Sequence, residues 1–416
     1  MGRDGRISGE VVKNLVCSTL QMLGIDVIDL DYSTTPTVEM AVKDFKAGAG
    51  IIFTASHNPK QWNALKLLGS NGEFISQSDL DQLTELVEHN DFEYAGVDDL
   101  GQITPESEYL HRHIEHILNM DLVDPAAIAA KNYRVVVDCI NSTGAIAVPA
   151  LLDRLGVDYT LLNEDITGDF QHNPEPLPEN LDQLAREVES SRAHLGIAVD
   201  PDVDRLAFVM ENGEMFGEEY TLVAVADYVL QHREGGAVSN LSSTRALRDV
   251  ARKHGRSYTA SAVGEVNVVT KMKETDAVIG GEGNGGVIVP ALHYGRDALA
   301  GIALFLTHLA TSGKTASALR RTYPSYFMSK NKITLDDSVD LEKLFGQLAK
   351  KYRNAELNTI DGLKIDLDEG WIHIRPSNTE PIVRVYTEST STVFADSLAR
   401  KIMGDVNDLL RGGEVE

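Results

Sequence analysis

Cysteine and basic residues are scarce in this chain, and each shortage excludes a class of protein. Of 416 residues only two are cysteines, Cys17 and Cys139, which lie far apart in apolar segments. Such a pair predicts buried thiols in a reducing compartment, with the cytoplasm expected, rather than a metal cluster. Lysine and arginine number 38 against 63 acidic residues, for a net charge of −25. Nucleic acids and anionic membranes are held by basic side chains, so we expect neither as a partner.

Long apolar runs and several well-known motifs are also missing. The longest apolar stretch, around residues 298–306, is too short to cross a bilayer. No apolar signal-peptide core follows the first residues, and Arg6 stands where a myristoylation signal needs Ser or Thr. No P-loop sequence occurs, so nothing indicates ATP as a phosphoryl donor. Small anionic ligands stay compatible with the composition, because they respond to the local potential of a cleft.

Short apolar runs alternate with amphipathic stretches over most of the chain, a rhythm that predicts parallel sheets covered by helices on both faces. The length alone favours about three domains of ~150 residues. Ser8 is expected to cap a helix that ends at Gly24, and Thr35 and Pro36 to open a second one. The other expected strands are 25–30, 50–53, 133–137, 159–162 and 195–199, and the other expected helices are 144–155, 178–190, 219–230, 244–253 and 298–308.

The last ninety or so residues follow a different order. A strand at 328–335, a helix at 339–352, strands at 360–367, 371–374 and 382–386, and a helix at 393–409 are expected. Consecutive strands beside two helices predict an α+β sheet with its helices on one face. Three α/β blocks of similar size and one distinct C-terminal block follow from these patterns.

The sequence Asp-Pro-Asp-Val-Asp-Arg at residues 200–205 carries the clearest chemical signal. It follows the expected strand 195–199, and open α/β sheets place ligand sites at the carboxyl ends of their strands. Asp200, Asp202 and Asp204 would repel one another unless a cation neutralises them. Hard oxygen ligands without a nearby His or Cys favour Mg²⁺.

Other interpretations of the same residues differ in strength. An EF-hand loop would use Glu211 as its last ligand, but Arg205 occupies the position that needs glycine, and the flanks are strands. That hypothesis fails. An aspartyl phosphotransferase, with Asp200 itself as the nucleophile, stays open as a minor alternative, and a solvated acidic turn is less favoured.

Residues 54–59, Thr-Ala-Ser-His-Asn-Pro, leave a second expected buried strand. Taken alone they are typical of a turn, and no nucleophile elbow surrounds Ser56. The matching acidic loop favours a functional role, because a serine near Mg²⁺ can hold a phosphoryl group whose charge the ion offsets. Lys66, ten residues further on, could act as a general base if its pKa were lowered.

Residues 281–286, Gly-Glu-Gly-Asn-Gly-Gly, match the spacing of a dinucleotide fingerprint. An extended run ended by Pro290 follows instead of a helix, and Glu282 would repel a pyrophosphate. A turn that displays the Glu282 carboxylate and the Asn284 amide suits sugar hydroxyls better, because the acid accepts hydrogen bonds and the amide both accepts and donates. A plain tight turn is the alternative.

Residues 375–381, Arg-Pro-Ser-Asn-Thr-Glu-Pro, lie between two C-terminal strands. Arginine offers a bidentate fork to phosphate, and hydroxyls, amides and loop N–H groups add donors. Cationic and neutral donors concentrate in no other turn of this acidic chain, which favours a phosphate site over a capped hairpin turn with a surface arginine. The residues concerned are Arg375, Ser377, Asn378, Thr379 and, on the next strand, Arg384.

A metal triad, a phosphorylatable serine, a hydroxyl-binding turn and a phosphate clamp together indicate a phosphosugar enzyme without a nucleotide site. With these four segments in this order and spacing, the sequence resembles the α-D-phosphohexomutase family (phosphoglucomutase/phosphomannomutase, including phosphoglucosamine mutases) over essentially its whole length. The resemblance implies three similar α/β domains with mostly parallel mixed sheets and a smaller C-terminal α+β domain around a central cleft. We expect these domains at residues 1–122, 123–233, 234–323 and 324–416.

The resemblance also implies roles for single residues. Ser56 would be the phosphoserine and, with Asp200, Asp202 and Asp204, would bind one Mg²⁺ ion. Arg205 would position the phosphoserine, and His57 and Lys66 would lie near the transferred group. A sugar 6-phosphate and 1-phosphate would interconvert through a bisphosphosugar, which is also the expected activator. Glu282 and Asn284 would contact the sugar hydroxyls, and the phosphate that is not transferred would be held by Arg375, Ser377, Asn378, Thr379 and Arg384.

Two departures from the family pattern bear on substrate and activity. Bacterial phosphomannomutases of this family typically show Gly-Glu-Met-Ser-Gly-His, whereas the form at 281–286 and Val-Gly-Glu-Val-Asn at 263–267 resemble archaeal-type phosphoglucosamine mutases. We therefore favour glucosamine phosphate over mannose or glucose phosphate. Residues 2–9 resemble a segment that normally lies well inside domain 1, so an N-terminal segment is expected to be missing. A sugar-phosphate-binding protein with impaired catalysis is the competing hypothesis. In either case we expect a monomer or a homodimer.

Overall fold

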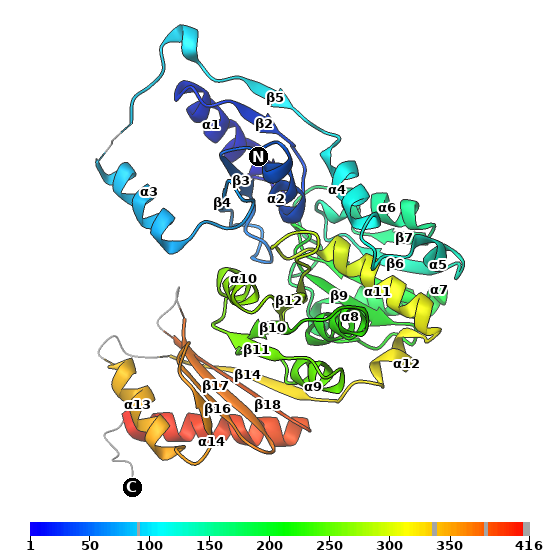
Figure 1. Ribbon diagram of the computed structural model, residues 1–416, viewed down its shortest axis with the longest axis vertical. Coiled ribbons are helices and arrows are strands. Elements are labelled where there is room, and N and C mark those ends of the chain that lie inside the picture. Colours follow the sequence, from blue (N-terminus) through cyan, green and yellow to red (C-terminus); the bar gives the residue numbers. More distant parts are fainter. Residues whose placement is uncertain (90–91, 335–338, 378–381, 411–416) are drawn as a thin grey trace.

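The structure is a computed structural model that describes residues 1–89, 92–334, 339–377 and 382–410. Four domains follow one another along the chain, and Figure 1 shows them from blue at the top to orange and red at the bottom. The predicted architecture is confirmed: three α/β units precede an antiparallel sheet with two helices. We keep the ranges of the sequence analysis as proposed domain bounds and call them domains 1 to 4. Within the described residues, no helix has the length and apolarity to cross a bilayer.

Domain 1 holds two small sheets beside four helices. Its main sheet has the order β1-β3-β4, with β4 antiparallel to β3, and β2 pairs with β5 in parallel. Val38, Ile52, Leu68 and Tyr109 form its apolar core. The elements are β1 (Gly2–Arg3), α1 (Gly9–Met22), β2 (Val27–Asp29), α2 (Thr35–Asp44), β3 (Ala49–Phe53), β4 (Leu65–Gly69), α3 (Gln77–His89), the 3₁₀ turn η1 (Val97–Asp99), β5 (Ile103–Pro105) and α4 (Tyr109–Leu118).

Domains 2 and 3 repeat one sheet plan. Three parallel strands are joined by an antiparallel fourth, in the orders β7-β6-β8-β9 and β11-β10-β12-β13. The strands are β6 (Arg134–Asp138), β7 (Asp158–Leu162), β8 (Leu195–Val199), β9 (Leu206–Met210), β10 (Ala237–Asn240), β11 (Tyr258–Ser261), β12 (Ile279–Glu282) and β13 (Gly286–Ile288). The helices are α5 (Pro125–Ala129), α6 (Gly144–Leu155), the 3₁₀ turn η2 (Pro178–Asn180), α7 (Asp182–Ser191), α8 (Glu218–His232), α9 (Ala246–Lys253), α10 (Glu265–Glu274), α11 (Ala298–Ser312) and α12 (Ala316–Arg320).

One apolar core runs through domains 2 and 3, whereas domain 4 has its own. Helix α8 contacts β9 as well as α9, α11 and β12. Phe208 of β9 stacks on Phe305 of α11 at 3.9 Å between ring centroids. Each such fully buried side chain contributes about 1.5–3 kcal/mol through removal of apolar surface from water. The shared core therefore holds the loops of these two domains in a defined relative position.

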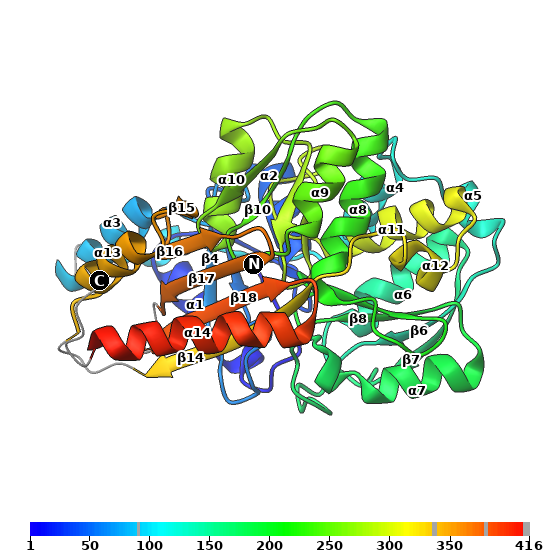
Figure 2. The same ribbon diagram turned by 90° about the horizontal axis from the view of Figure 1, so that it is seen from below.

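Domain 4 is an antiparallel sheet of order β14-β18-β17-β16-β15. Helices α13 and α14 cover one face, and Figure 2 shows α14 lying along the sheet. The elements are β14 (Phe327–Thr334), α13 (Leu341–Lys351), β15 (Glu356–Asn358), β16 (Leu363–Asp366), β17 (Gly370–Pro376), β18 (Ile382–Ser389) and α14 (Thr392–Leu410).

Most expected elements occur, with local corrections. Ser8 precedes α1 but makes no side-chain capping bond, because its hydroxyl accepts from the Asn63 amide instead. The expected helix 178–190 begins only at Asp182, after the η2 turn. The expected strand 360–367 is shortened to β16, because Gly362 has a positive φ of 69° and turns the backbone before it.

The four chemical segments occupy equivalent places in their domains. In each domain, the loop runs from one strand to its antiparallel neighbour: β3 to β4, β8 to β9, β12 to β13, and β17 to β18. A hairpin loop projects beyond the ends of its two strands, so four such strand ends that face one another bring four loops together. This repeated placement brings the four segments to one candidate site.

Candidate functional site

Ser56 and the acidic loop of domain 2 are in direct contact. The Ser56 hydroxyl donates to Asp200 Oδ2 at 2.7 Å, across 144 positions of sequence. Its backbone N–H donates to Thr54 Oγ1 at 2.9 Å, and its φ of 48° lies in the left-handed region. A non-glycine residue in that region costs free energy and persists only where surrounding contacts hold it. The loop therefore presents one hydroxyl to the acidic cluster.

The carboxylates of Asp200, Asp202 and Asp204 converge in a site that water does not reach. All three residues have 0% exposure, and they offer ligand oxygens within 4.8 Å of one another. Asp200 Oδ1 accepts two backbone N–H groups of its own loop at 3.0 Å. Asp202 Oδ1 and Asp204 Oδ1 have no hydrogen-bond partner. Two unpartnered buried carboxylate oxygens fit a hard divalent cation such as Mg²⁺, so the triad can hold one.

Lys66 lies at this triad as a cation, which corrects the expectation of a lowered pKa. Its Nζ donates to Asp202 Oδ2 at 2.5 Å and to Asp204 Oδ2 at 2.8 Å. Burial alone would lower the pKa of Lys66, but the two carboxylates outweigh burial and raise it. Conversely, burial and the two neighbouring acids raise the pKa of Asp200 well above its usual range. Sequence spacing could not reveal that the lysine points at two acids from another domain.

The glycine-rich turn of domain 3 lies beside the same cluster. Glu282 accepts from Asn240 Nδ2 at 2.8 Å and from the Gly264 N–H at 3.1 Å. Asn284 Oδ1 accepts the Gly286 N–H at 3.2 Å. At Gly285 a Cβ would lie 2.4 Å from the Leu206 carbonyl oxygen, so only glycine fits. The turn therefore packs against strand β9 and holds its polar side chains at the cleft.

The loop of domain 4 is described in part. Arg375 Nε donates to Asp361 Oδ2 at 3.1 Å, and Arg384 contacts the Tyr386 hydroxyl at 3.4 Å. The Ser377 N–H donates to the Ile382 carbonyl at 2.9 Å, which closes the base of the loop. Asn378 and Thr379, both predicted phosphate ligands, lie outside the described residues.

A single cavity of about 210 Å³ is lined by side chains from all four domains. Among them are His57 of domain 1, Arg205 of domain 2, Glu282 and Asn284 of domain 3, and Arg375 and Arg384 of domain 4. The expected central cleft is confirmed, with the predicted residues of four distant segments around it. Basic and acidic groups face each other across this space, which suits a ligand that carries both hydroxyls and a phosphate.

Comparison with known proteins agrees with this geometry. Profiles of phosphoglucomutase/phosphomannomutase match the chain in order: alpha/beta/alpha domain I over residues 1–94, domain II over 111–213, domain III over 217–326 and the C-terminal domain over 332–404. The chain belongs to this family. Membership places it among the phosphohexomutases, which are intramolecular phosphotransferases.

Individual members of the phosphoglucomutase/phosphomannomutase family are similar over nearly the full chain. Identity is 36% over 394 residues to a phosphoglucomutase/phosphomannomutase of Thermococcus kodakarensis, covering 94% of this chain and 86% of that protein. A probable phosphoglucosamine mutase of Methanopyrus kandleri is 32% identical over 415 residues, covering 99% and 89%. A family crystal structure from Burkholderia thailandensis superimposes with a TM-score of 0.83 at 27% identity, over 100% of this chain and 90% of that one.

Arginines that the sequence analysis gave no role hold this phosphohexomutase site together. Arg296 donates to Asp204 Oδ2 at 2.7 Å, to Glu265 Oε2 at 2.9 Å and to Glu282 Oε2 at 3.3 Å, so it connects the acidic loop to the glycine-rich turn. Arg6 donates to the carbonyls of the Ser56 loop. From the sequence alone, both arginines could have been named only as candidate site residues, because the groups that they contact in the site are distant in sequence.

Positive charge around Ser56 also affects the protonation state of the next residue, His57. Burial, and then the Arg205 guanidinium, lower the pKa of His57 to about 3, so its imidazole is neutral near pH 7. His57 Nδ1 lies 3.4 Å from Ser56 Oγ. Arg205 itself pairs with Glu175 at 2.9 Å. A neutral ring beside the hydroxyl leaves one nitrogen lone pair available to accept a proton.

The half-buried Glu219 of the cleft gives a testable pH dependence of stability. Burial raises its pKa from 4.5 to about 8, while its Oε2 accepts the Thr244 N–H at 2.9 Å. Because the folded state favours the neutral form of this carboxyl, the raised pKa contributes stability that is fully present below pH 4.5. That contribution is lost as the pH rises through 8. Glu219→Gln keeps the acceptor without the charge, so it should stabilise the protein relative to wild type as the pH rises from 5 to 8, by the order of 1 kcal/mol after solvent screening. Thermal unfolding of both proteins across this range checks it, and a constant difference between them would contradict it.

Proposed function

We propose that this chain interconverts the 6-phosphate and the 1-phosphate of a hexose, with Ser56 as the phosphoryl carrier and glucosamine phosphate as the preferred substrate. The observation that carries the proposal is the contact of Ser56 with Asp200 at the wall of a cavity lined by all four domains. No P-loop is present in the sequence, so the group to be transferred must reside on the protein.

In the proposed first step, the phosphoryl group of phosphorylated Ser56 passes to a sugar hydroxyl. The bond between phosphorus and Ser56 Oγ breaks while a bond to the sugar oxygen forms, which yields a bisphosphosugar. Asp200, Asp202 and Asp204 would hold one Mg²⁺, which supplies positive charge beside the transferred group. Lys66, held at the same triad, adds a fixed positive charge.

The sugar hydroxyl loses a proton in this step and the departing Ser56 Oγ gains one, and we assign the transfer of this proton to His57. Its imidazole is neutral, and it lies within 3.4 Å of Ser56 Oγ. A phosphoryl dianion on Ser56 favours the imidazolium and so raises the pKa of His57 from about 3 toward neutrality. Arg205, next to the acidic loop, positions the phosphoserine.

The remaining assignments concern the rest of the sugar phosphate. Arg375 and Arg384, with Ser377 and the loop residues Asn378 and Thr379, would hold the phosphate that is not transferred. Glu282 and Asn284 would hydrogen-bond the sugar hydroxyls. In the second half of the cycle, the bisphosphosugar reorients in the cleft, and its other phosphoryl group is transferred to Ser56. A trace of bisphosphosugar is therefore the expected activator, since it primes unphosphorylated enzyme.

Names of relatives support the choice of sugar. Seven similar archaeal proteins, at 30–33% identity, carry the name probable phosphoglucosamine mutase, and one at 36% is called phosphoglucomutase/phosphomannomutase. The alternative is phosphomannomutase or phosphoglucomutase activity, with which the name of the 36% identical relative agrees.

Phosphorus NMR of three reactions tests the proposal. Glucosamine 6-phosphate, mannose 6-phosphate or glucose 6-phosphate is incubated with the protein, Mg²⁺ and a trace of hexose 1,6-bisphosphate. We expect a 1-phosphate, formed fastest from glucosamine 6-phosphate and abolished by a chelator. Faster conversion of mannose or glucose phosphate would correct the substrate alone, whereas absence of a 1-phosphate in all three reactions would contradict the proposed function, even if the sugar phosphates bind.

A further inference from the structure

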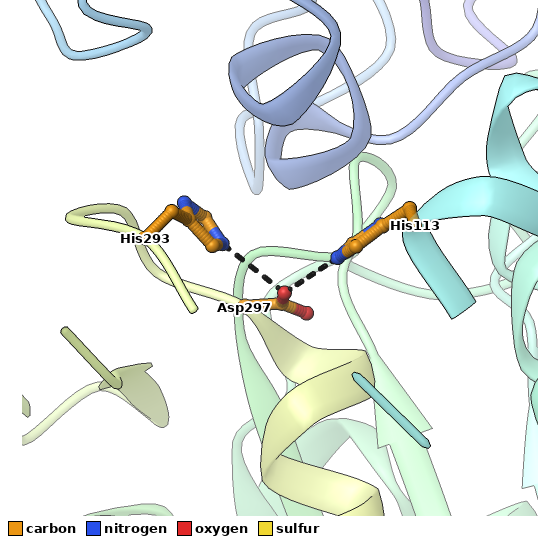
Figure 3. A group of neighbouring side chains, drawn as sticks. All are labelled: His113, His293 and Asp297. Atoms are coloured by element: carbon orange, nitrogen blue, oxygen red, sulfur yellow. Dashed lines mark hydrogen bonds and ion pairs between the residues drawn. The ribbon is translucent and has the colours of Figure 1, made fainter. Parts of the chain in front are cut away.

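A second cluster of metal-ligand side chains lies outside the proposed active site. His113 comes from α4 of domain 1, and His293 and Asp297 come from the segment that enters α11 of domain 3 (Figure 3). Asp297 Oδ2 lies 2.8 Å from His113 Nε2 and 3.1 Å from His293 Nε2. Its other oxygen accepts the Ala300 N–H at 3.0 Å and caps the helix. Two imidazoles from separate domains therefore point at one carboxylate oxygen.

The far nitrogens of both rings face partners on one helix, α2. His113 Nδ1 lies 3.0 Å from Thr37 Oγ1, and His293 Nδ1 lies 3.2 Å from Glu39 Oε2. Histidines that ligate a metal through one nitrogen usually have the other oriented by a carboxylate, carbonyl or hydroxyl in this way. The arrangement fixes both rings with Nε2 directed inward.

Glu39 supplies an independent observation. It is 1% exposed, and neither of its carboxylate oxygens makes a hydrogen bond of normal geometry; nor does His293 Nδ1. Glu39 and Asp297 place two carboxyl groups in this buried volume, with the His293 ring between them. The nearby cations Lys66 and Arg296 already pair with the acids of the active site. Buried carboxyl groups are costly unless they are paired or bind a metal, and a divalent ion at this cluster would compensate their charge.

We propose that His113 Nε2, His293 Nε2 and Asp297 Oδ2 bind one divalent transition-metal ion, with Zn²⁺ as the best match. Two imidazoles and one carboxylate are a ligand set suited to zinc, whereas Mg²⁺ prefers oxygen ligands such as those of the Asp200 triad. Glu39 Oε2 lies 3.2 Å from His293 Nδ1, where it would orient that ligand. The ion joins domain 1 to domain 3, one residue from Arg296, which contacts Asp204.

Zinc and cobalt binding to the full chain tests this site. The protein is prepared without a histidine tag and stripped with a chelator, and Zn²⁺ is then titrated and counted by elemental analysis. Asp200→Asn controls for the acidic triad, and His111→Gln is a matched control because His111 is exposed on the same helix as His113. We expect one tightly bound equivalent of Zn²⁺ in wild type and both controls, and its loss in His113→Gln and His293→Gln.

Two further measurements keep the test independent of folding defects in the histidine variants. Stripped wild type should show the visible absorption bands of low-symmetry Co²⁺ when Co²⁺ is added, and Zn²⁺ should remove them. Glu39→Gln should weaken Zn²⁺ binding about 10- to 100-fold, the usual effect of removing a group that orients a ligand. Equal Zn²⁺ binding by His111→Gln and His113→Gln, or absence of both the Co²⁺ bands and the Zn²⁺ equivalent in wild type, would overturn the site and leave an ion-free hydrogen-bond network.

Discussion

Replacement of Ser56 by alanine should lower mutase turnover by at least about 10⁴-fold, the scale on which covalent nucleophiles act. The Ser56 hydroxyl donates to Asp200 Oδ2 at 2.7 Å, so it is the hydroxyl that faces the acidic triad. A steady-state assay with the preferred sugar phosphate, Mg²⁺ and bisphosphosugar measures the effect. Ser78→Ala, which changes an exposed serine on α3, is the matched control and should keep wild-type turnover.

Backbone strain at Ser56 allows the chemical effect to be separated from a folding effect. With φ at 48°, alanine is strained there as serine is, whereas glycine is not. Ser56→Gly should therefore match or exceed the thermal stability of Ser56→Ala and be equally inactive. Recovery of turnover in the glycine variant would contradict the assignment of the hydroxyl as nucleophile.

Mass spectrometry of the intact Ser56→Ala protein decides between serine and aspartate as the carrier. After incubation with bisphosphosugar, wild type should gain the mass of one phosphoryl group, and the variant should not. A phosphoryl group that persists in the variant would instead indicate the alternative in which Asp200 is phosphorylated.

Replacement of Arg6 by methionine should destabilise domain 1 by about 3–5 kcal/mol, the cost of leaving one partner of a buried ion pair alone. Arg6 is 1% exposed, and its Nε donates to Asp4 Oδ2 at 3.0 Å. Burial already raises the pKa of Asp4 to about 6 despite this arginine. The other N–H groups donate to four carbonyls of the serine loop, those of Ser56, Asn58, Pro59 and Trp62.

Urea and thermal unfolding, together with turnover, measure the Arg6 effect. Turnover should also fall at temperatures where the variant is folded, because the loop that presents Ser56 loses its main support. Arg154→Met is the matched control, since Arg154 forms an exposed pair with Glu115 and such pairs contribute less than about 1 kcal/mol. Arg6→Lys should recover part of the stability through its charge, but three donors cannot replace five. Equal stability of Arg6→Met and Arg154→Met would show that the loop is held by other contacts.

Much of the fold could be predicted because its signals are local. Apolar runs followed by polar turns identified strands such as β6 and β8, and the amphipathic spacing identified helices such as α13. Elements with weaker local signals were missed: β4 is only partly buried, α3 is exposed, and the apolar face of α4 is recognisable only against its neighbours. Gly362 shortened one strand through a turn that the apolar pattern did not reveal.

The acidic triad, Ser56 and the glycine-rich turn were likewise predictable, because each lies within six residues of sequence at the end of a strand. The raised pKa of Lys66 could not be predicted in this way. A lysine in isolation carries no information about which charges face it, and here two aspartates more than 130 positions away determine its state.

The sequence by itself determined which chemical groups this protein has and in what order: a triad of aspartates, a serine in a turn, a glycine-rich turn with one carboxylate and one amide, and a loop flanked by two arginines, in an acidic, four-part chain. Only the tertiary structure decided which of them meet, and hence their charge states. It brought Ser56 to Asp200, Arg296 to three separate acids, and His113 to Asp297 across 184 positions. The physical reason is that residue type and periodicity are local properties. Burial, Coulomb interaction and metal coordination depend on distances through space, and those distances are set by how the domains pack.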